Sequence, residues 1–241
     1  MLQAELSFRV RYGETDRMGF VYYAAYLPWM VECACQLYPG SPHPPAFAVD
    51  YFTPCGYDDL VQVTARSTKP GQAEVAVTKE GAVAASGMLF YTLPQELEPS
   101  GLKQGNIWRT SITVRAHETQ PWGISAVTAL SWFEASRNEH MRATGLTYAE
   151  CERRGIWLPV VHAWAELKAG VEAGAEITIE SIAIQSGVRV GFANRILNAQ
   201  GKELCSGGTL HVCITPAGKV LKPMPELLKR LALTSHALVV L

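Results

Sequence analysis

The stretch that decides the fold is Val10-Arg-Tyr-Gly-Glu-Thr-Asp-Arg-Met-Gly-Phe-Val-Tyr-Tyr-Ala-Ala-Tyr26. Apolar side chains recur at every second position ahead of its turn, at Leu6, Phe8, Val10 and Tyr12. This period of two predicts a strand with one buried face. A polar turn that contains Asp16 and Gly19 follows, and a long apolar segment begins near Tyr22. The stretch therefore predicts a strand, a turn and a helix.

The junction between the turn and the helix offers specific chemistry. The first N–H groups of a helix have no intrahelical partner and carry the positive end of the helix dipole, so they can polarise a carbonyl. Asp16 lies just upstream, where a carboxylate can attack an acyl carbonyl or activate a water molecule. An Asp before a helix also commonly caps the turn or the helix start. Spacing alone leaves both roles open.

The segment from Asp16 to Tyr26 resembles the Asp-x-x-Gly-x-Val-Tyr-x-x-x-Tyr signature of the hydroxybenzoyl-CoA thioesterase-type hotdog family. The preceding Val-Arg-Tyr-x-Glu-Thr, residues 10–15, also matches many members. The resemblance implies that Asp16 is the catalytic carboxylate and that the backbone N–H of Tyr23 polarises the thioester carbonyl. Many members carry His and Asn where this chain has Tyr23 and Ala25. The backbone N–H of Tyr23 can still polarise the carbonyl. A role that other members give to the His side chain at this position is lost in this chain.

Composition and charge exclude several classes of protein. Of 241 residues, 48% are hydrophobic and 18% charged, which is typical of a globular protein. A formal net charge of -1 gives no reason to expect binding to nucleic acid or to an anionic membrane. No run approaches the ~20 apolar residues of a membrane helix, and the first residues lack the pattern of a secretory leader. We expect a cytoplasmic protein.

The cysteines predict neither a disulfide framework nor a metal site. No Cys-x-x-Cys pair occurs among them. We expect all six to be reduced, mostly buried small hydrophobic side chains. They are Cys33, Cys35, Cys55, Cys151, Cys205 and Cys213. The resemblance implies no dissociable cofactor, because CoA enters only as part of the substrate.

The chain repeats one order of elements twice. Each half is predicted as a strand, a long helix and four further strands, in which the later strands form an antiparallel meander. The first half has its helix at 21–38 and strands at 46–53, 60–67, 73–79 and 83–93. The second half has a strand at 108–115, a helix at 127–144 and strands at 156–165, 176–185, 188–198 and 203–215. The pattern Val-Arg-x-x-Glu-Thr recurs at residues 10–15 and 114–119. An internal repeat of this size implies two copies of one folding unit.

This order of elements is that of the hotdog fold, so we expect an α+β double hotdog. In each unit an antiparallel sheet curls around a central helix. The predicted domains are a first unit at 1–97, a linker at 98–106, a second unit at 107–226 and a tail at 227–241. We interpret the apolar tail as a docking helix. Family hotdogs pair, so the repeat is expected to build one pair within the chain, and a homodimer of such chains is expected.

The two halves diverge where the chemistry lies. Gln120 stands where the first half has Asp16, and a neutral amide can neither accept a proton at working pH nor act as an anionic nucleophile. The sequence therefore predicts one active site per chain, with the second half shaping the pocket. Other candidate catalytic residues lie in the second turn and on the helices. They are His117, Glu118, Glu32 and Glu134, none of which falls in a recognised catalytic motif, and Glu118 matches Glu14 as a structural residue.

The substrate is expected to contact residues of the motif and positive groups elsewhere. The predicted substrate-binding residues are Gly19, Val21, Tyr22, Tyr26 and Arg189. CoA carries phosphates, so Lys69, Lys168 and Arg195 are further candidates, although the interpretation of each as an ordinary solvated surface charge is favoured. The aromatic residues near the motif are compatible with aryl or fatty acyl groups and leave the acyl group open.

Three functions follow from these residues. The first is hydrolysis of an acyl-CoA or acyl-carrier-protein thioester by Asp16 and the helix start at Tyr23. The second is a non-catalytic acyl-CoA-binding hotdog protein, which the change at Gln120 and the absence of His at Tyr23 favour. The third is hydration or dehydration of an acyl thioester, for which neither His43 nor His140 occupies a matching position.

Overall fold

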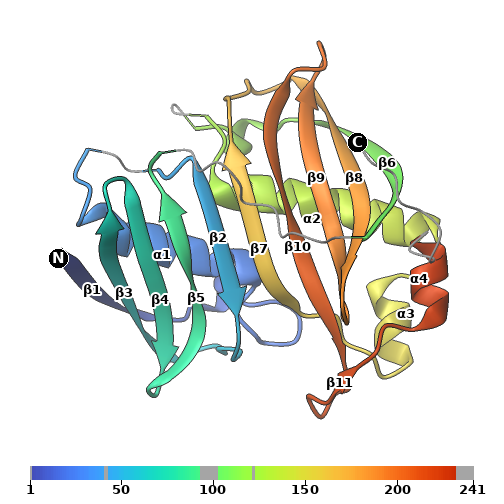
Figure 1. The fold of residues 1–241 in the computed structure, drawn as a ribbon, viewed down its shortest axis with the longest axis horizontal. Helices are drawn as coiled ribbons and strands as arrows, with labels where there is room; N and C mark the ends of the chain where they lie inside the picture. The colour runs from blue at the N-terminus through green and yellow to red at the C-terminus, as the bar shows by residue number, and fades with distance from the viewer. Residues whose placement is uncertain (1, 41–42, 93–102, 121–122, 232–241) are drawn as a thin grey trace. The chain divides into compact units, whose positions relative to one another are not determined.

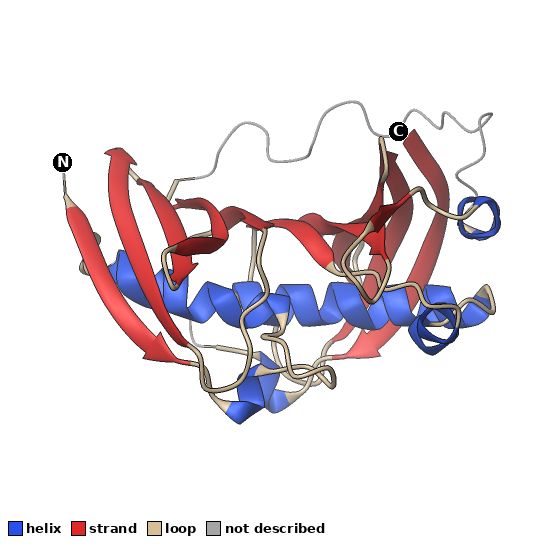
Figure 2. Ribbon diagram, turned by 90° about the horizontal axis from the view of Figure 1, so that it is seen from below, coloured by secondary structure: helices blue, strands red, loops and turns tan. Residues whose placement is uncertain are grey.

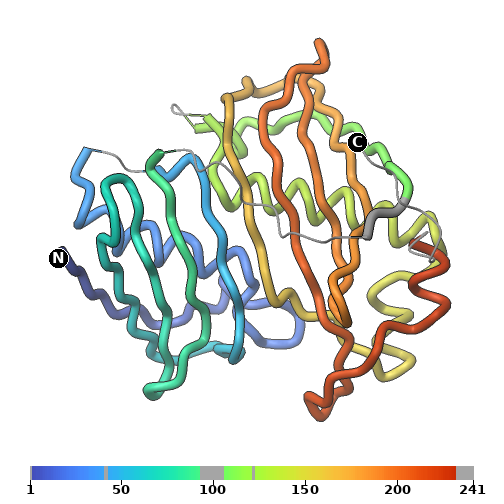
Figure 3. The backbone as a smooth tube through the Cα atoms, in the orientation of Figure 1, coloured from blue at the N-terminus to red at the C-terminus, as the bar shows by residue number. Residues whose placement is uncertain are grey.

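The structure is a computed structural model, and it describes residues 2–40, 43–92, 103–120 and 123–231. The chain divides into two compact units, which Figures 1 and 3 trace from blue to red. Unit 1 comprises residues 1–97 with 125–127 and 164–167, and unit 2 comprises 98–124, 128–163 and 168–241. Among the described residues no helix is both long enough and apolar enough to cross a membrane.

Unit 1 is a curled antiparallel sheet with one helix against it (Figure 2). The strands lie in the order β1-β3-β4-β5-β2. They are β1 (Gln3–Arg9), β2 (Ala46–Tyr51), β3 (Leu60–Lys69), β4 (Gln72–Lys79) and β5 (Ala82–Phe90). The helix α1 (Tyr26–Cys35) packs on β3, where the thiol of Cys33 donates to the carbonyl of Val63 at 3.3 Å.

The predicted meander is correct for β3, β4 and β5 but wrong for β2, which pairs with β5 instead of β3. The tight turns between β3, β4 and β5 contain Gly71 and Gly81, both with positive φ, and such turns join neighbouring strands. The connection from β2 to β3 spans residues 52–59 and includes Pro54. A connection of this length does not form a hairpin, so β2 reaches the other side of β5.

The first helix begins later than the predicted residue 21. Val21 forms a β-bridge with Thr15, and Tyr22 is extended with φ −60° and ψ 129°. A short 3-10 turn, η2 (Tyr23–Ala25), then leads directly into α1. Pro28 falls in the first turn of α1, where its missing N–H costs nothing. The helical segment that follows the motif therefore starts at Tyr23.

Unit 2 repeats this plan with additions. Its strands lie in the order β7-β10-β9-β8-β6, and β11 pairs with β10. They are β6 (Lys103–Thr113), β7 (Val160–Leu167), β8 (Glu176–Ser186), β9 (Arg189–Asn198), β10 (Glu203–Ile214) and β11 (Val220–Leu221). Its helices are α2 (Ala126–Ala143), α3 (Tyr148–Arg153) and α4 (Pro225–Arg230). Neither α3 nor β11 was predicted from the sequence, and α4 overlaps the start of the helix expected in the tail 227–241.

Two predicted segment boundaries need correction. β6 begins at Lys103, inside the predicted linker 98–106, because Gln104 pairs with Ile184 and the strand extends beyond its apolar part. The predicted tail 227–241 begins inside α4, and Leu227 and Leu231 are buried in the core of unit 2. The remaining residues of both segments lie outside the described part of the chain.

The two units share hydrogen bonds position by position. In unit 1 the N–H of Val10 donates to the carbonyl of Asp59 at 2.9 Å, and in unit 2 the N–H of Val114 donates to that of Ala175 at 2.9 Å. The residue before each acceptor, Asp58 or Gly174, has positive φ and donates back to the same valine. The repeat seen in the sequence is thus a repeat of backbone geometry.

The two central helices, α1 and α2, bury different kinds of side chain. The buried residues of α1 are apolar or weakly polar, whereas α2 also buries Ser136, Arg137 and His140. The guanidinium of Arg137 donates to Thr209 Oγ1 at 3.1 Å and lies 3.3 Å from Nε2 of His211. Burial and the Arg137 charge lower the pKa of His211 to about 3, so this imidazole is neutral at physiological pH.

Candidate active site

Asp16 lies at the tip of a hairpin formed by the motif. The arms of the hairpin meet at the bridge between Thr15 and Val21. The N–H of Asp16 donates to the carbonyl of Phe20 at 2.7 Å, which closes the tip. Oδ1 of Asp16 accepts from the N–H of Met18 at 2.8 Å and from that of Phe20 at 3.2 Å. The carboxylate therefore caps its own turn, as the structural alternative predicts.

Capping uses only one of the two carboxylate oxygens. No described residue donates a hydrogen bond to Oδ2 of Asp16, and the residue is exposed. The two backbone donors fix the plane of the carboxylate, while Oδ2 keeps its capacity to accept a proton or a hydrogen bond from water. The cap and a catalytic role are therefore compatible in this geometry.

Tyr23 opens the helical segment that follows the hairpin. The side chain of Tyr22, at the N-cap position, makes no capping hydrogen bond, and the N–H of Tyr22 donates to the carbonyl of Glu14 at 2.8 Å. Tyr23 lies three residues beyond Phe20, the partner of Asp16, which is about 10 Å of extended chain. This short length of chain separates the carboxylate from the start of the helical segment.

Glu14 has the structural role that was predicted for it. Its carboxylate accepts from the N–H of Arg11 at 2.7 Å and from the indole Nε1 of Trp29 at 3.1 Å. In unit 2 the carboxylate of Glu118 accepts from the N–H of Arg115 at 2.7 Å in the same way. Both glutamates hold the start of their turns, so neither is available as a substitute catalyst.

The connection between β2 and β3 supports the hairpin, and the sequence analysis missed it. The N–H of Val21 donates to the carbonyl of Cys55 at 2.8 Å, and Phe20 forms a β-bridge with Gly56. The N–H of Cys55 donates in turn to the hydroxyl of Tyr26 at 3.2 Å. The available signal was a run of turn residues, 53–59, between two strands, but its partner could not be read from local sequence.

The predicted substrate-binding residues of unit 1 fall into two groups. Gly19 is exposed with φ +80°, and Tyr22 is half-buried. Val21 and Tyr26 are buried, at 7% and 3% exposure, so they belong to the core that supports the site. Burial, with the neighbouring Cys55, raises the pKa of Tyr26 well above its ordinary value.

Tyr26 belongs to a cluster of aromatic rings under the helix start. Its ring lies 5.6 Å from that of Tyr51 and 5.4 Å from that of Trp29, and Tyr23 lies 6.1 Å from Tyr51. The hydroxyl of Tyr51 is buried and has no hydrogen-bond partner among the described residues. The cluster therefore forms packed core at the start of the helical segment.

The candidate phosphate contacts lie at strand ends. Arg189 is exposed at the start of β9 in unit 2, and the structure does not place it with Asp16 in one unit. Lys168 pairs with Glu203 at 2.7 Å, and Arg195 pairs with Glu180 at 2.7 Å. Lys69, at the end of β3, is exposed. The ion pairs favour structural roles for Lys168 and Arg195.

The remaining alternatives lack a suitable setting. His117 and Glu32 are exposed, and Glu134 lies 3.8 Å from the guanidinium of Arg137. The prediction that most cysteines are buried is confirmed, since Cys35 alone of the six is partly exposed, and all six are free. No group of three or more potential metal ligands occurs among the residues that the structure describes.

The second turn keeps the frame of the first but is closed by a different hydrogen bond. The N–H of Gln120 donates to the carbonyl of Gly123 at 3.1 Å, and the N–H of Gly123 donates to the carbonyl of Gln120 at 2.9 Å. Asp16 reaches Phe20, four residues on, whereas Gln120 reaches Gly123, three residues on. The N–H of Gly19 donates to the carbonyl of Asp16 at 3.0 Å, so Gly123 occupies the place of Gly19, and the two turns differ in the carbonyl that accepts from Asp16 or Gln120.

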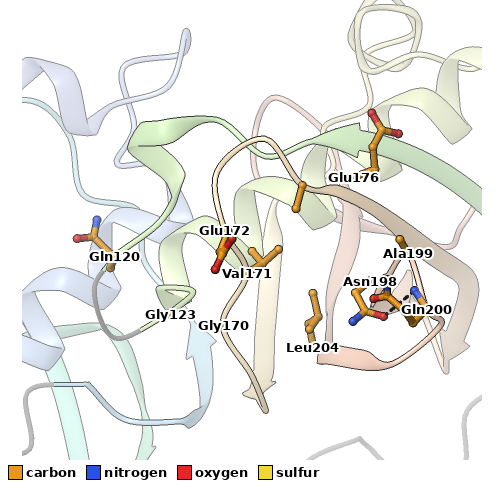
Figure 4. Close-up of a pocket in the computed structure, with 11 residues that line it drawn as sticks. Gln120, Gly123, Gly170, Val171, Glu172, Glu176, Asn198, Ala199, Gln200 and Leu204 are labelled. Carbon is orange, nitrogen blue, oxygen red and sulfur yellow. Dashed lines mark hydrogen bonds between the residues drawn. The ribbon is translucent and has the colours of Figure 1, made fainter.

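Next to this second tip, unit 2 has an open hollow of about 730 Å³ (Figure 4). Figure 4 shows the Gln120 turn on one side and the turn between β9 and β10 on the other. The hollow is lined by residues of three loops and of the strands that they join. Those that matter for its chemistry are Gln120, Val171, Glu172, Glu176, Asn198, Gln200 and Leu204.

The chain is similar to known esterases and thioesterases. No family model matches the sequence. A candidate esterase of Synechocystis sp. is 30% identical over 123 residues, which are 49% of this chain and 74% of that protein.

Solved structures with little sequence identity share the fold. A candidate oleoyl thioesterase of Lactobacillus plantarum is 13% identical with a TM-score of 0.61, and the match covers 87% of this chain and 96% of that one. A 12:0-ACP thioesterase of Umbellularia californica is 10% identical with a TM-score of 0.61, over 88% and 98% of the two chains. An acyl-ACP thioesterase of Bacteroides thetaiotaomicron is 9% identical with a TM-score of 0.61, over 87% and 97%.

Proposed function

The chain belongs to the hotdog-fold thioesterases, and on that premise we propose that it hydrolyses an acyl-CoA or acyl-carrier-protein thioester at Asp16. The observation that carries this proposal is the state of the Asp16 carboxylate. Two backbone N–H groups hold Oδ1, and no described residue donates to Oδ2. A fixed carboxylate with one oxygen available, beside the start of a buried helix, suits attack on an acyl carbonyl.

Each group has one role in the proposed reaction. The thioester carbonyl lies at the start of the helical segment, where the backbone N–H of Tyr23 and the helix dipole stabilise the developing oxyanion. Oδ2 of Asp16 either takes a proton from the attacking water as general base or attacks the carbonyl itself as nucleophile. The thiol leaves in both cases. Gly19 and Tyr22 border the substrate, while Val21 and Tyr26 support the site from the core.

Only unit 1 carries this chemistry in our proposal. Gln120 cannot take the place of Asp16, because a carboxamide has no basic oxygen at working pH. Unit 1 and unit 2 form a double hotdog in tandem, with unit 1 as the catalytic copy. The chain works in the cytoplasm without a dissociable cofactor, it pairs as a homodimer, and Arg189 contacts a substrate phosphate.

A second candidate function is acyl-CoA binding without turnover. The observations that favour it are the neutral Gln120 and the presence of Tyr23 and Ala25 where many family members carry His and Asn. The backbone role of Tyr23 does not depend on those side chains, so we place hydrolysis first.

One assay distinguishes hydrolysis from binding without turnover. Purified protein is offered acyl-CoAs of varied chain length and aromaticity, and release of free thiol is followed for the wild type and for Asp16→Asn. We expect at least one good substrate, with a loss of about 10²–10⁴-fold in the variant, as for removal of a general base. Tight binding of every acyl-CoA without thiol release supports the binding protein, and hydrolysis that Asp16→Asn leaves intact rules out our mechanism.

A further inference from the structure

The space between the central helix and the sheet is filled by different side chains in the two units. In unit 1 Ala65 pairs with Val75 across β3 and β4. The same positions of unit 2, counted from the valine bonds of the repeat, are Ser181 and Asn194, which pair across β8 and β9. An apolar pair of unit 1 is thus a polar pair in unit 2.

The same exchange occurs on the central helix and on the next strand. Counted from the glycines of the two turns, Arg137 of α2 takes the place of Cys33 of α1. By strand register, Thr209 of β10 takes the place of Leu89 of β5. Arg137 and Thr209 are buried, at 4% and 1% exposure. Unit 2 therefore has a polar core where unit 1 has an apolar one.

Hydroxyl groups and one carboxamide make up the neutral part of this polar core. Oγ of Ser136 lies 2.8 Å from Oγ of Ser181 and 3.0 Å from Oγ1 of Thr110. The hydroxyl of Ser181 donates to Oδ1 of Asn194 at 2.6 Å, and the NH₂ group of Asn194 donates to the carbonyl of Phe192 at 3.3 Å. Each of these side chains has a hydrogen-bond partner, and a satisfied network fixes one packing of helix on sheet.

The charged part of the polar core contains His211, which is 3% exposed on β10. Its Nδ1 lies 2.8 Å from the carbonyl of Leu158. A carbonyl only accepts hydrogen bonds, so Nδ1 carries the ring proton and Nε2 is the acceptor. Nε2 lies 3.3 Å from Nη1 of Arg137 and 3.2 Å from Oγ1 of Thr209. The hydrogen bonds thus specify a neutral imidazole in contact with a guanidinium group.

The groups that face this imidazole supply no compensating negative charge. From α2 it meets Nη1 of Arg137, whereas Glu134 lies 3.8 Å from the other nitrogen of that guanidinium, Nη2. Across the sheet, Val190 of β9 pairs with His211. The segment of α3 supplies the ring of Tyr148, which lies 5.6 Å from Cζ of Arg137. The charge in contact with His211 is therefore positive.

A proton on Nε2 of His211 is incompatible with this packing. It removes the acceptor that faces Arg137 and Thr209, and it places two cations 3.3 Å apart in a buried part of the core. Burial and the Arg137 charge accordingly lower the pKa of His211 to about 3. In an opened chain the imidazole returns to its ordinary pKa of about 6.5. The closed form is therefore fully favoured above that value and loses stability as the pH falls below it.

We propose that protonation of His211 separates α2 from β10 in mild acid, so that unit 2 opens below about pH 6 while unit 1 stays closed. The inference goes beyond the proposed function and does not depend on it. His140 of α2 adds to the effect, because its ring is buried 5.3 Å from the rings of Trp108 and Phe192. Among the described residues of unit 1 no histidine is buried. Mild acid thus acts on the polar core alone.

Hydrogen exchange of the full-length protein, followed by mass spectrometry between about pH 7.5 and pH 5, tests the proposal. In the wild type we expect the opening constant of α2 and β10 to rise by up to about tenfold per pH unit for each histidine that takes up a proton. The opening constant of α1 and β3 is expected to stay constant. His211→Gln offers an amide oxygen to Arg137 but takes up no proton, so its rise should be smaller than that of the wild type by up to about tenfold per pH unit. His117→Asn removes an exposed histidine of unit 2 and is expected to keep the wild-type rise.

The wild type gives a second readout, which does not require that His211→Gln folds. In NMR spectra of the closed protein the ring of His211 is expected to show no titration above about pH 5, because the imidazole stays neutral until unit 2 opens. A titration of this ring near pH 6.5 in the closed protein overturns the proposal. So does an equal rise of the opening constants of both units, or a His211→Gln variant that keeps the full wild-type rise.

Discussion

The turns at Asp16 and Gln120 have nearly the same frame and different tips. Arg11 and Arg115, which begin the two turns, have φ and ψ of −89° and 154° and of −86° and 154°. Both turns are held by a glutamate that accepts the N–H of its arginine. The first turn then places a carboxylate on two backbone amides, whereas the second has a carboxamide at that position and is closed by a bond to Gly123.

This difference separates the residues that build a turn from those that carry chemistry. The glutamates and the valine bonds recur in both units because each unit needs them to close its sheet. Asp16 and the Asp59–Lys79 ion pair occur in unit 1, whereas Gln120, Ala175 and Asn198 stand at the equivalent positions of unit 2. The fold therefore does not require an acid at the tip, which is why the acid of unit 1 points to function.

The largest expected effect concerns transfer of the acid from one turn to the other. In Asp16→Asn combined with Gln120→Asp, a carboxylate is present only in the second turn. We expect hydrolysis to stay about 10²–10⁴-fold below the wild type, because the N–H of Gln120 bonds to Gly123 and not to the position of Phe20, so the second turn holds its tip differently. Steady-state thiol release on the best substrate measures this. Recovery to within tenfold of the wild type would show that the two tips are interchangeable.

The next effect compares the two structural glutamates. Glu14 accepts from a backbone N–H and from the indole of Trp29, whereas Glu118 accepts from one backbone N–H. Glu14→Ala also leaves the buried indole without its partner, so we expect it to lower the free energy of unfolding by about 2–4 kcal/mol, against about 1 kcal/mol for Glu118→Ala. Urea unfolding of the two variants measures both losses of free energy. Equal losses would contradict the larger structural role of Glu14.

The smallest effect concerns the ion pair that unit 2 lacks. Burial alone would raise the pKa of Asp59, but the N–H of Gly56 and the ammonium of Lys79 together hold it below its ordinary value. A lowered carboxyl pKa stabilises the fold above the unfolded-state pKa of about 3.9, and this contribution is lost as the pH falls through the lower folded-state pKa.

Because both side chains are partly exposed, we expect the pair to stabilise unit 1 by about 1 kcal/mol or less at pH 7. Lys79→Met removes the partner of Asp59 and should lower the urea midpoint slightly at pH 7 and hardly at all near pH 3. Chemical unfolding at the two pH values tests this. The same loss at both pH values would mean that Lys79 acts by packing and not by charge.

Local sequence patterns predicted much of each unit. The helix expected at 127–144 is α2 (Ala126–Ala143), and the strand expected at 203–215 is β10 (Glu203–Ile214). Both have long periodic patterns and clear end signals, so their bounds are local properties. The start of α1 was missed because Val21 is held in a bridge with Thr15, a contact that competes with the helix and that propensity does not report.

What the sequence could not supply depends on contacts between distant residues. The pairing of β2 with β5, the support of Val21 by Cys55 and the polar contacts of Arg137 join segments far apart in the chain. The roles of Asp16 and Tyr23 in catalysis remain predictions.

The most direct measurement of the central claim is single-turnover hydrolysis of the best acyl-CoA by Asp16→Asn, beside His117→Asn as the matched control. His117 is exposed in the equivalent turn of unit 2, so its substitution tests for general damage to a turn. The account predicts a rate about 10²–10⁴-fold below the wild type for Asp16→Asn and a wild-type rate for His117→Asn. Equal rates for the two variants would contradict it.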